Sequence, residues 1–363
     1  MLIILTAAVL ISAFGISALA ANSSENYDEI NSALSEEAKE ALEKLGIKEI
    51  DFDSVFNVSA DRAWELFKEL VTGNIDSPMK CLVRLLSVII LLAVCESFVP
   101  EGSGIKPITE AVGVLLCVIS VISPLSKAIS SAVASVSATE SFMVALIPTL
   151  AGVVAVSGNP TLAVSFQTIA FTAAQLMSAV SKNYIVPVVG AVLSLDITGA
   201  LMPSFWLSSL TSLIKKVITT VLSFGSTVFV SALGIKGALA NAADTVASRS
   251  VKLVISSAVP VVGGALSEAY NGVIGSLVLV KSTLGIFGIV AVALINLPSL
   301  IQLLFWSFAL RLSAAAAELF HRHTIAELLT AISSAAVLLN VVLLFNAVLF
   351  IISTALILVI KAG

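Results

Sequence analysis

The sequence predicts an all-α, polytopic membrane protein with interrupted or half-spanning helices. Of its 363 residues, 58% are hydrophobic and only 12% are charged, whereas a soluble domain carries about 25% charged residues. Apolar residues gather in long runs, and about 20 such residues suffice for a helix to cross a bilayer. Proline and glycine interrupt several runs, and broken membrane helices persist only where protein or a water-filled cavity covers the freed backbone groups.

Residues 1–20 form an apolar run that is typical of a signal peptide. The run ends in Ala18-Leu19-Ala20, a small-x-small pattern of the kind that signal peptidase accepts. Its start carries no basic residue, so a retained N-terminal anchor is the alternative. In either case we expect the following segment to lie outside the cytoplasm.

Residues 22–80 form an acidic segment with 14 acidic and 6 basic residues. Its pattern predicts two short amphipathic helices, one from an N-cap at Ser35 to Gly46 and one from near Ser59 to Gly73. Two such helices bury too little apolar surface to be stable alone. We therefore expect them to dock on a partner or on the membrane body, the alternative being a flexible spacer.

Residues 81–363 form the predicted polytopic membrane domain, with about 8–10 hydrophobic segments. The last segment contains two asparagines, so one tilted helix and a tight hairpin are both open. The apolar windows are Leu82–Val99, Ile108–Ile122, Phe142–Val156, Leu162–Val180, Tyr184–Leu201, Leu213–Leu233, Leu253–Leu266, Val273–Leu297, Ile301–Ala317 and Ala331–Ile360.

The membrane domain shows a possible two-fold internal repeat, with halves at 108–202 and 213–317. Residues 142–154 precede a similar stretch, residues 254–266, by 112 positions, which aligns Pro148 with Pro260 and Gly152 with Gly264. Matching interrupted segments in two halves are typical of pseudo-symmetric transporter folds.

The stretch from residue 251 to 298 combines prolines, glycines and isolated charges in an apolar setting. A charge at bilayer depth is costly and usually faces the bundle interior, and an Asn271-Gly272 pair divides the stretch. The simpler interpretation is that Pro and Gly are common in membrane helices, that small residues allow close packing, and that the lysine reaches an interface. The candidate structural or translocation positions are Pro148, Gly152, Pro260, Gly263, Gly264, Glu268, Lys281, Gly285 and Gly288.

No motif for catalysis, nucleotide binding or metal binding is present, so we expect no enzyme activity, no cofactor and no metal. His321 and His323 are two positions apart, which places them on different faces of a helix. Cys81, Cys95 and Cys117 form no CxxC pair. No part of the chain has the basic face that nucleic-acid binding requires.

Several motifs resemble those of the stage III sporulation protein AE family of endospore-forming bacteria. They are FMVALIP (Phe142–Pro148), the break at Ser157-Gly158, PVVG (Pro260–Gly263) and VLVKSTLGIFGIV (Val278–Val290). The order of a signal sequence, an acidic segment and a membrane body is also similar. The neutral start of residues 1–20 departs from the family pattern and leaves cleavage of the signal open.

The resemblance implies a non-enzymatic, multi-pass protein of the mother-cell membrane that faces the forespore. Its implied partners are the lipid bilayer, other stage III sporulation A-type proteins including a secretion-type ATPase and ring-forming components, and a forespore membrane partner. Together these would build a secretion-like channel that spore development requires. The alternative function is a free-standing secondary transporter or permease, since broken helices and buried charges would suit one.

Overall fold

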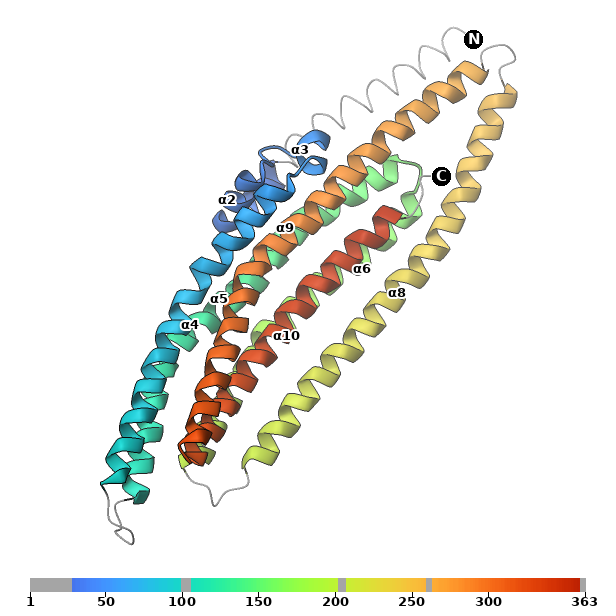
Figure 1. Ribbon diagram of the computed structural model, residues 1–363. Helices are drawn as coiled ribbons and strands as arrows, with labels where there is room; N and C mark the ends of the chain where they lie inside the picture. Colours follow the sequence, from blue (N-terminus) through green and yellow to red (C-terminus); the bar gives the residue numbers. More distant parts are fainter. Residues whose placement is uncertain (1–27, 99–105, 202–206, 259–262, 360–363) are drawn as a thin grey trace.

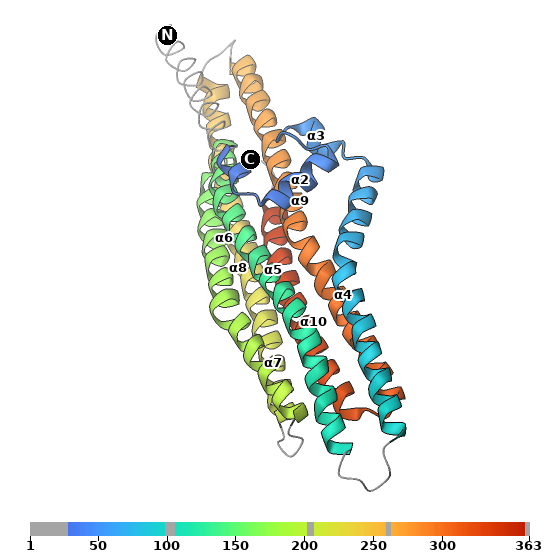
Figure 2. The ribbon, with the colours of Figure 1, turned by 90° about the vertical axis from the view of Figure 1, so that its left-hand side faces the viewer.

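The protein is a bundle of long helices. A computed structural model describes residues 28–98, 106–201, 207–258 and 263–359. All regular secondary structure within these ranges is helical, which confirms the all-α class. The helices lie side by side in an elongated bundle (Figures 1 and 2). The predicted signal peptide or anchor at 1–20, and Pro260, lie outside the described residues.

Six helices of the described part are long and apolar enough to cross a membrane. Among them, α6, η1 and α7 follow one another without a break, and η1 is a π-helical segment. The elements are α2 (Glu36–Leu45), α3 (Phe52–Phe56), α4 (Ala60–Ser97), α5 (Lys106–Val156), α6 (Pro160–Val180), η1 (Ser181–Ile185), α7 (Val186–Leu201), α8 (Leu207–Ala258), α9 (Gly263–Leu319) and α10 (His323–Val359).

The helices are longer and less interrupted than the sequence predicted. Pro148 lies inside α5, and the Asn271-Gly272 pair lies inside α9, so neither produces the expected interruption. The C-terminal segment is the single helix α10 and not a hairpin. A proline removes one backbone hydrogen bond and bends a helix, but packing on both sides of it can keep the helix continuous.

The described residues do not show the predicted internal repeat. Residues 142–154 lie wholly within α5, whereas residues 254–258 end α8 and residues 263–266 begin α9. The two stretches therefore occupy different positions in the bundle, one inside a helix and one at a connection. Small apolar residues recur often enough in membrane helices to produce such a match without a structural repeat.

The bundle has two separate apolar cores along its length. The upper core, near α2 in Figure 1, joins α2 to α5, α6, α9 and α10 and includes Phe142 and Phe287. Their ring centroids are 6.2 Å apart. The lower core joins α4, α5, α9 and α10 and includes Leu85 and Trp306, both fully buried. Both cores lie on α9, whose 57 residues extend over about 85 Å.

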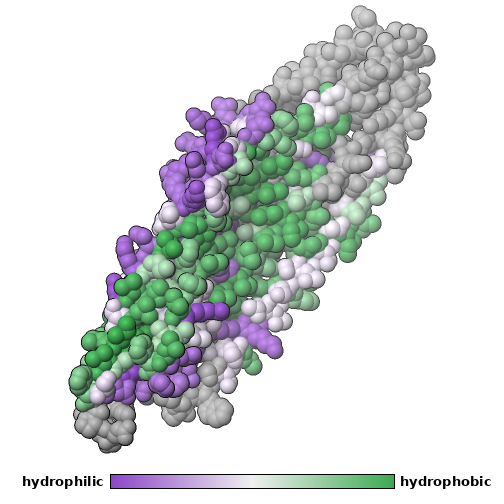
Figure 3. All heavy atoms as spheres, viewed as in Figure 1, coloured by the Kyte–Doolittle hydropathy of each residue, from purple (hydrophilic) through white to green (hydrophobic). Residues whose placement is uncertain are grey.

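The first amphipathic helix forms as predicted and packs on the body. Ser35 accepts a hydrogen bond from the Ala38 amide, and Gly46 ends α2 with a positive φ of 90°. The apolar face of α2, which includes Leu42 and Leu45, is part of the upper core. The described part of the acidic segment, residues 28–80, is therefore docked and is not a flexible spacer. Hydrophilic residues gather over α2, α3 and the start of α4 beside a broad apolar band (Figure 3).

The second amphipathic helix begins as predicted, with Ser59 as the N-cap of α4. Its predicted end at Gly73 is wrong, because α4 continues through Gly73 to Ser97. A glycine ends a helix when it adopts the left-handed conformation, as Gly46 does, and not by its presence alone. Lys44 of α2 donates to Glu69 of α4 over 2.6 Å, and this contact, with Glu40, raises the pKa of Lys44.

Candidate functional site: a polar belt between two apolar cores

A belt of polar side chains lies between the upper and lower cores. It contains both neutral and charged groups. The belt consists of Ser131, Ser135, Thr139 and Glu140 on α5, Ser178 on α6, Lys182 in η1, and Asn296 and Ser299 on α9.

The neutral part of the belt is a seam between α5 and α9. The hydroxyl of Ser299 lies 2.8 Å from that of Ser135 and 3.0 Å from that of Ser131. One turn away, the Asn296 side-chain amide donates to Thr139 Oγ1 over 2.8 Å. Ser131, Ser135 and Thr139 are four residues apart, so they lie on one face of α5.

The charged part of the belt joins α5 to α6 and η1. Lys182 Nζ lies 2.7 Å from the Glu140 carboxylate, which also accepts a hydrogen bond from Ser178. The two charged side chains are 31% and 26% exposed. The two charges are of opposite sign and in contact, so the pair adds no net charge to the belt.

A second ion pair ties α7 and α8 to α10 beside the lower core. Lys215 Nζ lies 3.0 Å from the Asp196 carboxylate, whose side chain is 4% exposed. Lys215 also donates to Ser334 and, over 3.4 Å, to the carbonyl of Ala331. Removing one charge of such a pair leaves the other buried without compensation, which costs several kcal/mol.

Two further polar contacts hold the end of one helix against a neighbouring helix. Arg322, 4% exposed, donates to the Leu92 carbonyl of α4 over 2.7 Å and pairs with Glu96. Asp244 of α8 accepts from the backbone amides of Thr161 and Leu162 over 3.2 and 2.9 Å. A carboxylate is stabilised there because it faces the positive end of the α6 dipole.

Three of the predicted positions lie in the interior, on α9. Lys281 is 4% exposed. A Cβ added at Gly285 would overlap the Leu358 side chain of α10, with Leu358 Cγ at 2.7 Å. At Gly288 it would meet Leu146 of α5 at 2.5 Å. Gly285 and Gly288 therefore let α9 approach α10 and α5 closely, in agreement with the packing interpretation.

The other predicted positions do not join a common site in the described part. Pro148 and Gly152 are exposed on α5, and a Cβ at Gly152 would meet nothing within 4 Å. Gly263, Gly264 and Glu268 lie in the first two turns of α9, where the structure describes no side-chain surroundings, and Pro260 is not described.

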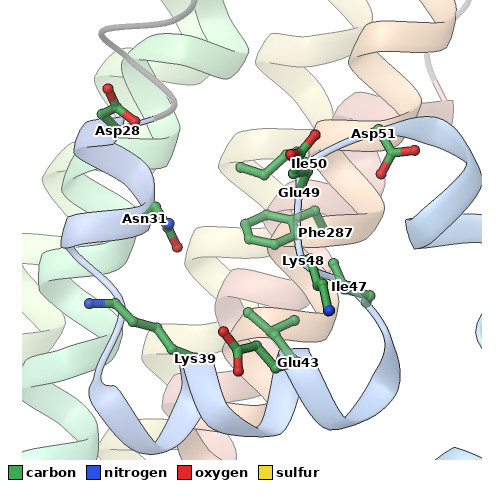
Figure 4. A pocket seen from close by; sticks show the side chains of 11 residues that line it. Asp28, Asn31, Lys39, Glu43, Ile47, Lys48, Glu49, Ile50, Asp51 and Phe287 are labelled. Carbon is green, nitrogen blue, oxygen red and sulfur yellow. The ribbon is translucent and has the colours of Figure 1, made fainter.

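A surface hollow of about 530 Å³ lies where the acidic segment docks. Its walls are the stretch just before α2, α2 itself, the loop after it, and Phe287 of α9, which lies behind them (Figure 4). Lys39, Lys48, Glu43 and Glu49 give it both signs of charge. Within the described residues, no group of three or more His, Cys, Asp or Glu could hold a metal ion.

The seam was not predicted from the sequence, although its pattern is present there. Ser131, Ser135 and Thr139 recur every four residues in a stretch of small residues, and that spacing places them on one helix face. Their partners Asn296 and Ser299 lie more than 150 positions away, so the pairing depends on which helices pack together.

Residues 47–361 match the protein family described as Stage III sporulation protein AE. The chain belongs to this family. The stage III sporulation protein AE of Bacillus subtilis (strain 168) is 24% identical over 215 residues, which are 59% of this chain. The chain spans about half the length of that relative, since the match covers 54% of it. No solved structure matches.

The match to the sporulation family includes the lower core, the whole polar belt and the part of the upper core from Ile47 onward, because it extends from the loop after α2 through the end of α10. α2 lies outside the matched residues but packs on α9, which lies inside them. The match confirms the family resemblance that the sequence motifs indicated. The polar belt lies within the matched residues.

We expect Gly288→Ala to lower the free energy of unfolding by roughly 1–3 kcal/mol, the usual cost of overfilling a packed core. The measurement is thermal or denaturant unfolding of the purified protein in detergent. Gly275→Ala on the same helix is the control, because a Cβ there would meet nothing within 4 Å. Equal stability of the two variants would contradict the close approach of α9 to α5.

We expect Asp196→Asn to destabilise the protein by about 3 kcal/mol, because it leaves the Lys215 charge uncompensated. The double variant Asp196→Leu with Lys215→Met should recover most of this loss, as measured by a double-mutant cycle of unfolding. Lys216→Met is the control, since Lys216 is the exposed neighbour of Lys215. A double variant as unstable as Asp196→Asn would contradict the pairing.

Proposed function

We propose that the protein is a non-enzymatic membrane subunit of the channel or secretion-like apparatus between mother cell and forespore. Membership of the sporulation family supports a role in spore development. The proposed location is the mother-cell membrane facing the forespore, with a signal peptide at 1–20 and the acidic segment outside the cytoplasm. The proposed partners are the other stage III sporulation A-type proteins, including a secretion-type ATPase and ring-forming components, and a forespore membrane partner.

The observation that carries this proposal is the set of ion pairs and close helix contacts that hold the bundle together. The charges at Glu140 and Asp196 each meet a partner on another helical element, and Arg322 in the α9–α10 connection pairs with Glu96 of α4. The glycines of α9 bring three helices into close contact. Such contacts favour one rigid arrangement over alternating ones. A rigid platform on which other subunits assemble needs this property.

A secondary transporter is the second candidate, and the buried Lys281 favours it. Ionisable side chains inside membrane bundles commonly take part in substrate or ion pathways. The two functions differ in what Lys281 contributes, because a platform needs its packing and a transporter needs its charge.

The test is complementation of a strain that lacks the gene, followed by microscopy with a late forespore reporter. A platform predicts that Lys281→Met supports near-normal sporulation, whereas a Gly285→Leu and Gly288→Leu double variant fails to recover its partners and leaves engulfed forespores stalled. Lys216→Met serves as the matched control for loss of a lysine.

Two outcomes would contradict the platform proposal. Normal spores in the deletion strain, with a growth or uptake defect instead, would remove the sporulation role. Loss of sporulation in Lys281→Met with unchanged protein level and partner recovery would favour the transporter.

A further inference from the structure

A basic hollow opens on the protein surface between α4 and α5. It has a volume of about 450 Å³, and the two helices lie side by side (Figures 1 and 2). Its lining contains three cationic side chains against one carboxylate, Asp76. The cations are Lys80 and Arg84 on α4 and Lys127 on α5, and serine hydroxyls at Ser77, Ser120 and Ser123 accompany them. The basic hollow is therefore positively charged, although the whole chain has a formal net charge of -4.

Two of these cations have no anionic partner in the part of the chain that the structure describes. Neither Arg84 nor Lys127 forms an ion pair there, and both side chains are exposed. Lys80 lies 3.3 Å from Asp76, one turn away, but the two side chains are 75% and 73% exposed. Such an exposed pair contributes little to stability. The protein therefore leaves positive charge in the basic hollow available to a bound anion.

The charge pattern of both helices places the basic hollow at the level of a membrane surface. From Lys106 to Lys127 the backbone of α5 rises about 31 Å, which matches the hydrocarbon thickness of about 30 Å. Glu110 is the only charged residue between them. On α4, no charged residue lies between Arg84 and Glu96. Lipid phosphates lie just outside the hydrocarbon region, so they reach the level of these cations.

An exposed apolar face continues from the basic hollow along α5. Ile119, Ser123 and Lys127 line the basic hollow, and their spacing of four residues places them on one face of the helix. Ile119 is 68% exposed, and the exposed Leu115 and Val112 extend this face away from the cations. A phospholipid has the same arrangement, with a charged phosphate followed by acyl chains. The face therefore offers a surface for both parts of a lipid molecule.

We propose that the basic hollow binds the headgroup of an anionic phospholipid. Arg84 would donate two hydrogen bonds to the phosphate, and Lys127 would contact it as a point charge. The hydroxyls of Ser77 and Ser123 would donate to the remaining headgroup oxygens. Basic pockets between membrane helices are known to bind anionic headgroups. A lipid without net charge, such as phosphatidylcholine, brings its own cation and gains less from this site.

The first experiment counts the lipids bound to the purified full chain in detergent by native mass spectrometry. Phosphatidylglycerol and phosphatidylcholine with identical acyl chains are titrated in parallel. We expect one phosphatidylglycerol per chain to bind about tenfold more tightly than phosphatidylcholine, because each basic residue near a headgroup favours the anionic lipid. In lipid-free detergent, sodium phosphate should not raise the unfolding midpoint above that in sodium chloride of equal ionic strength.

The variants assign the preference to the basic hollow. Arg84→Gln with Lys127→Gln should lower the affinity for phosphatidylglycerol to that for phosphatidylcholine. Its unfolding midpoint in phosphatidylcholine should be unchanged, because both side chains are exposed, so the lost preference does not reflect misfolding. The control is Lys216→Gln with Lys236→Gln, which removes the same charge from exposed positions of α8 and should keep the tenfold preference.

Three results would overturn the proposal. Equal affinity for the two lipids, or an unchanged preference in the Arg84→Gln, Lys127→Gln variant, would mean that the basic hollow does not select the anionic headgroup. Loss of the preference in the α8 control would mean that net charge attracts the lipid. A midpoint raised by sodium phosphate alone would make free phosphate the ligand. Each would leave the sporulation role intact, since that role is tested by spore formation.

Discussion

A polar group buried between apolar helices must find its partner inside the protein, because neither lipid nor water is there to replace it. This requirement determines how the bundle is held together. Asp196 reaches Lys215, Glu140 reaches Lys182, and Arg322 reaches the Leu92 carbonyl. The first two contacts join different helical elements and the third joins the α9–α10 connection to α4, so each one also fixes how far one element is displaced along the other. Apolar packing alone would leave that displacement less specific.

The same requirement applies to the backbone. Pro124 cannot donate to the carbonyl of Ser120, and the Cys81 thiol of α4 lies 3.8 Å from that oxygen. Pro298 likewise leaves the Leu294 carbonyl without its helical N–H donor, and both residues line a hollow beside the hydroxyl seam. At Pro124 a polar side chain of the neighbouring helix lies beside the carbonyl that the proline leaves without its helical donor, and at Pro298 hydroxyl residues of α5 line the same hollow. Pro148, in contrast, is exposed on α5.

Local chemistry made some of the fold predictable from sequence. Ser35, Gly46 and Ser59 act as caps as expected, since caps depend on a few neighbouring residues. The continuity of α5 and α9 could not be predicted in this way, because tertiary packing along a helix overrides the local preference of a proline or an Asn-Gly pair. The glycines at 285 and 288 were recognisable as packing positions, whereas Asn296 was not, since its partner Thr139 is 157 positions distant.

α9 connects these features, because both apolar cores, the polar belt and the docked acidic segment lie on it. The most direct measurement is therefore the length of α9 in the membrane. Spin labels at Ser276→Cys and Leu304→Cys, with the native cysteines replaced by alanine, report one distance by pulsed electron paramagnetic resonance in lipid nanodiscs. A continuous helix predicts about 42 Å for the 28 residues between them. A distance below about 30 Å would mean that α9 breaks or folds back. The two cores and the belt would then not lie on one continuous helix.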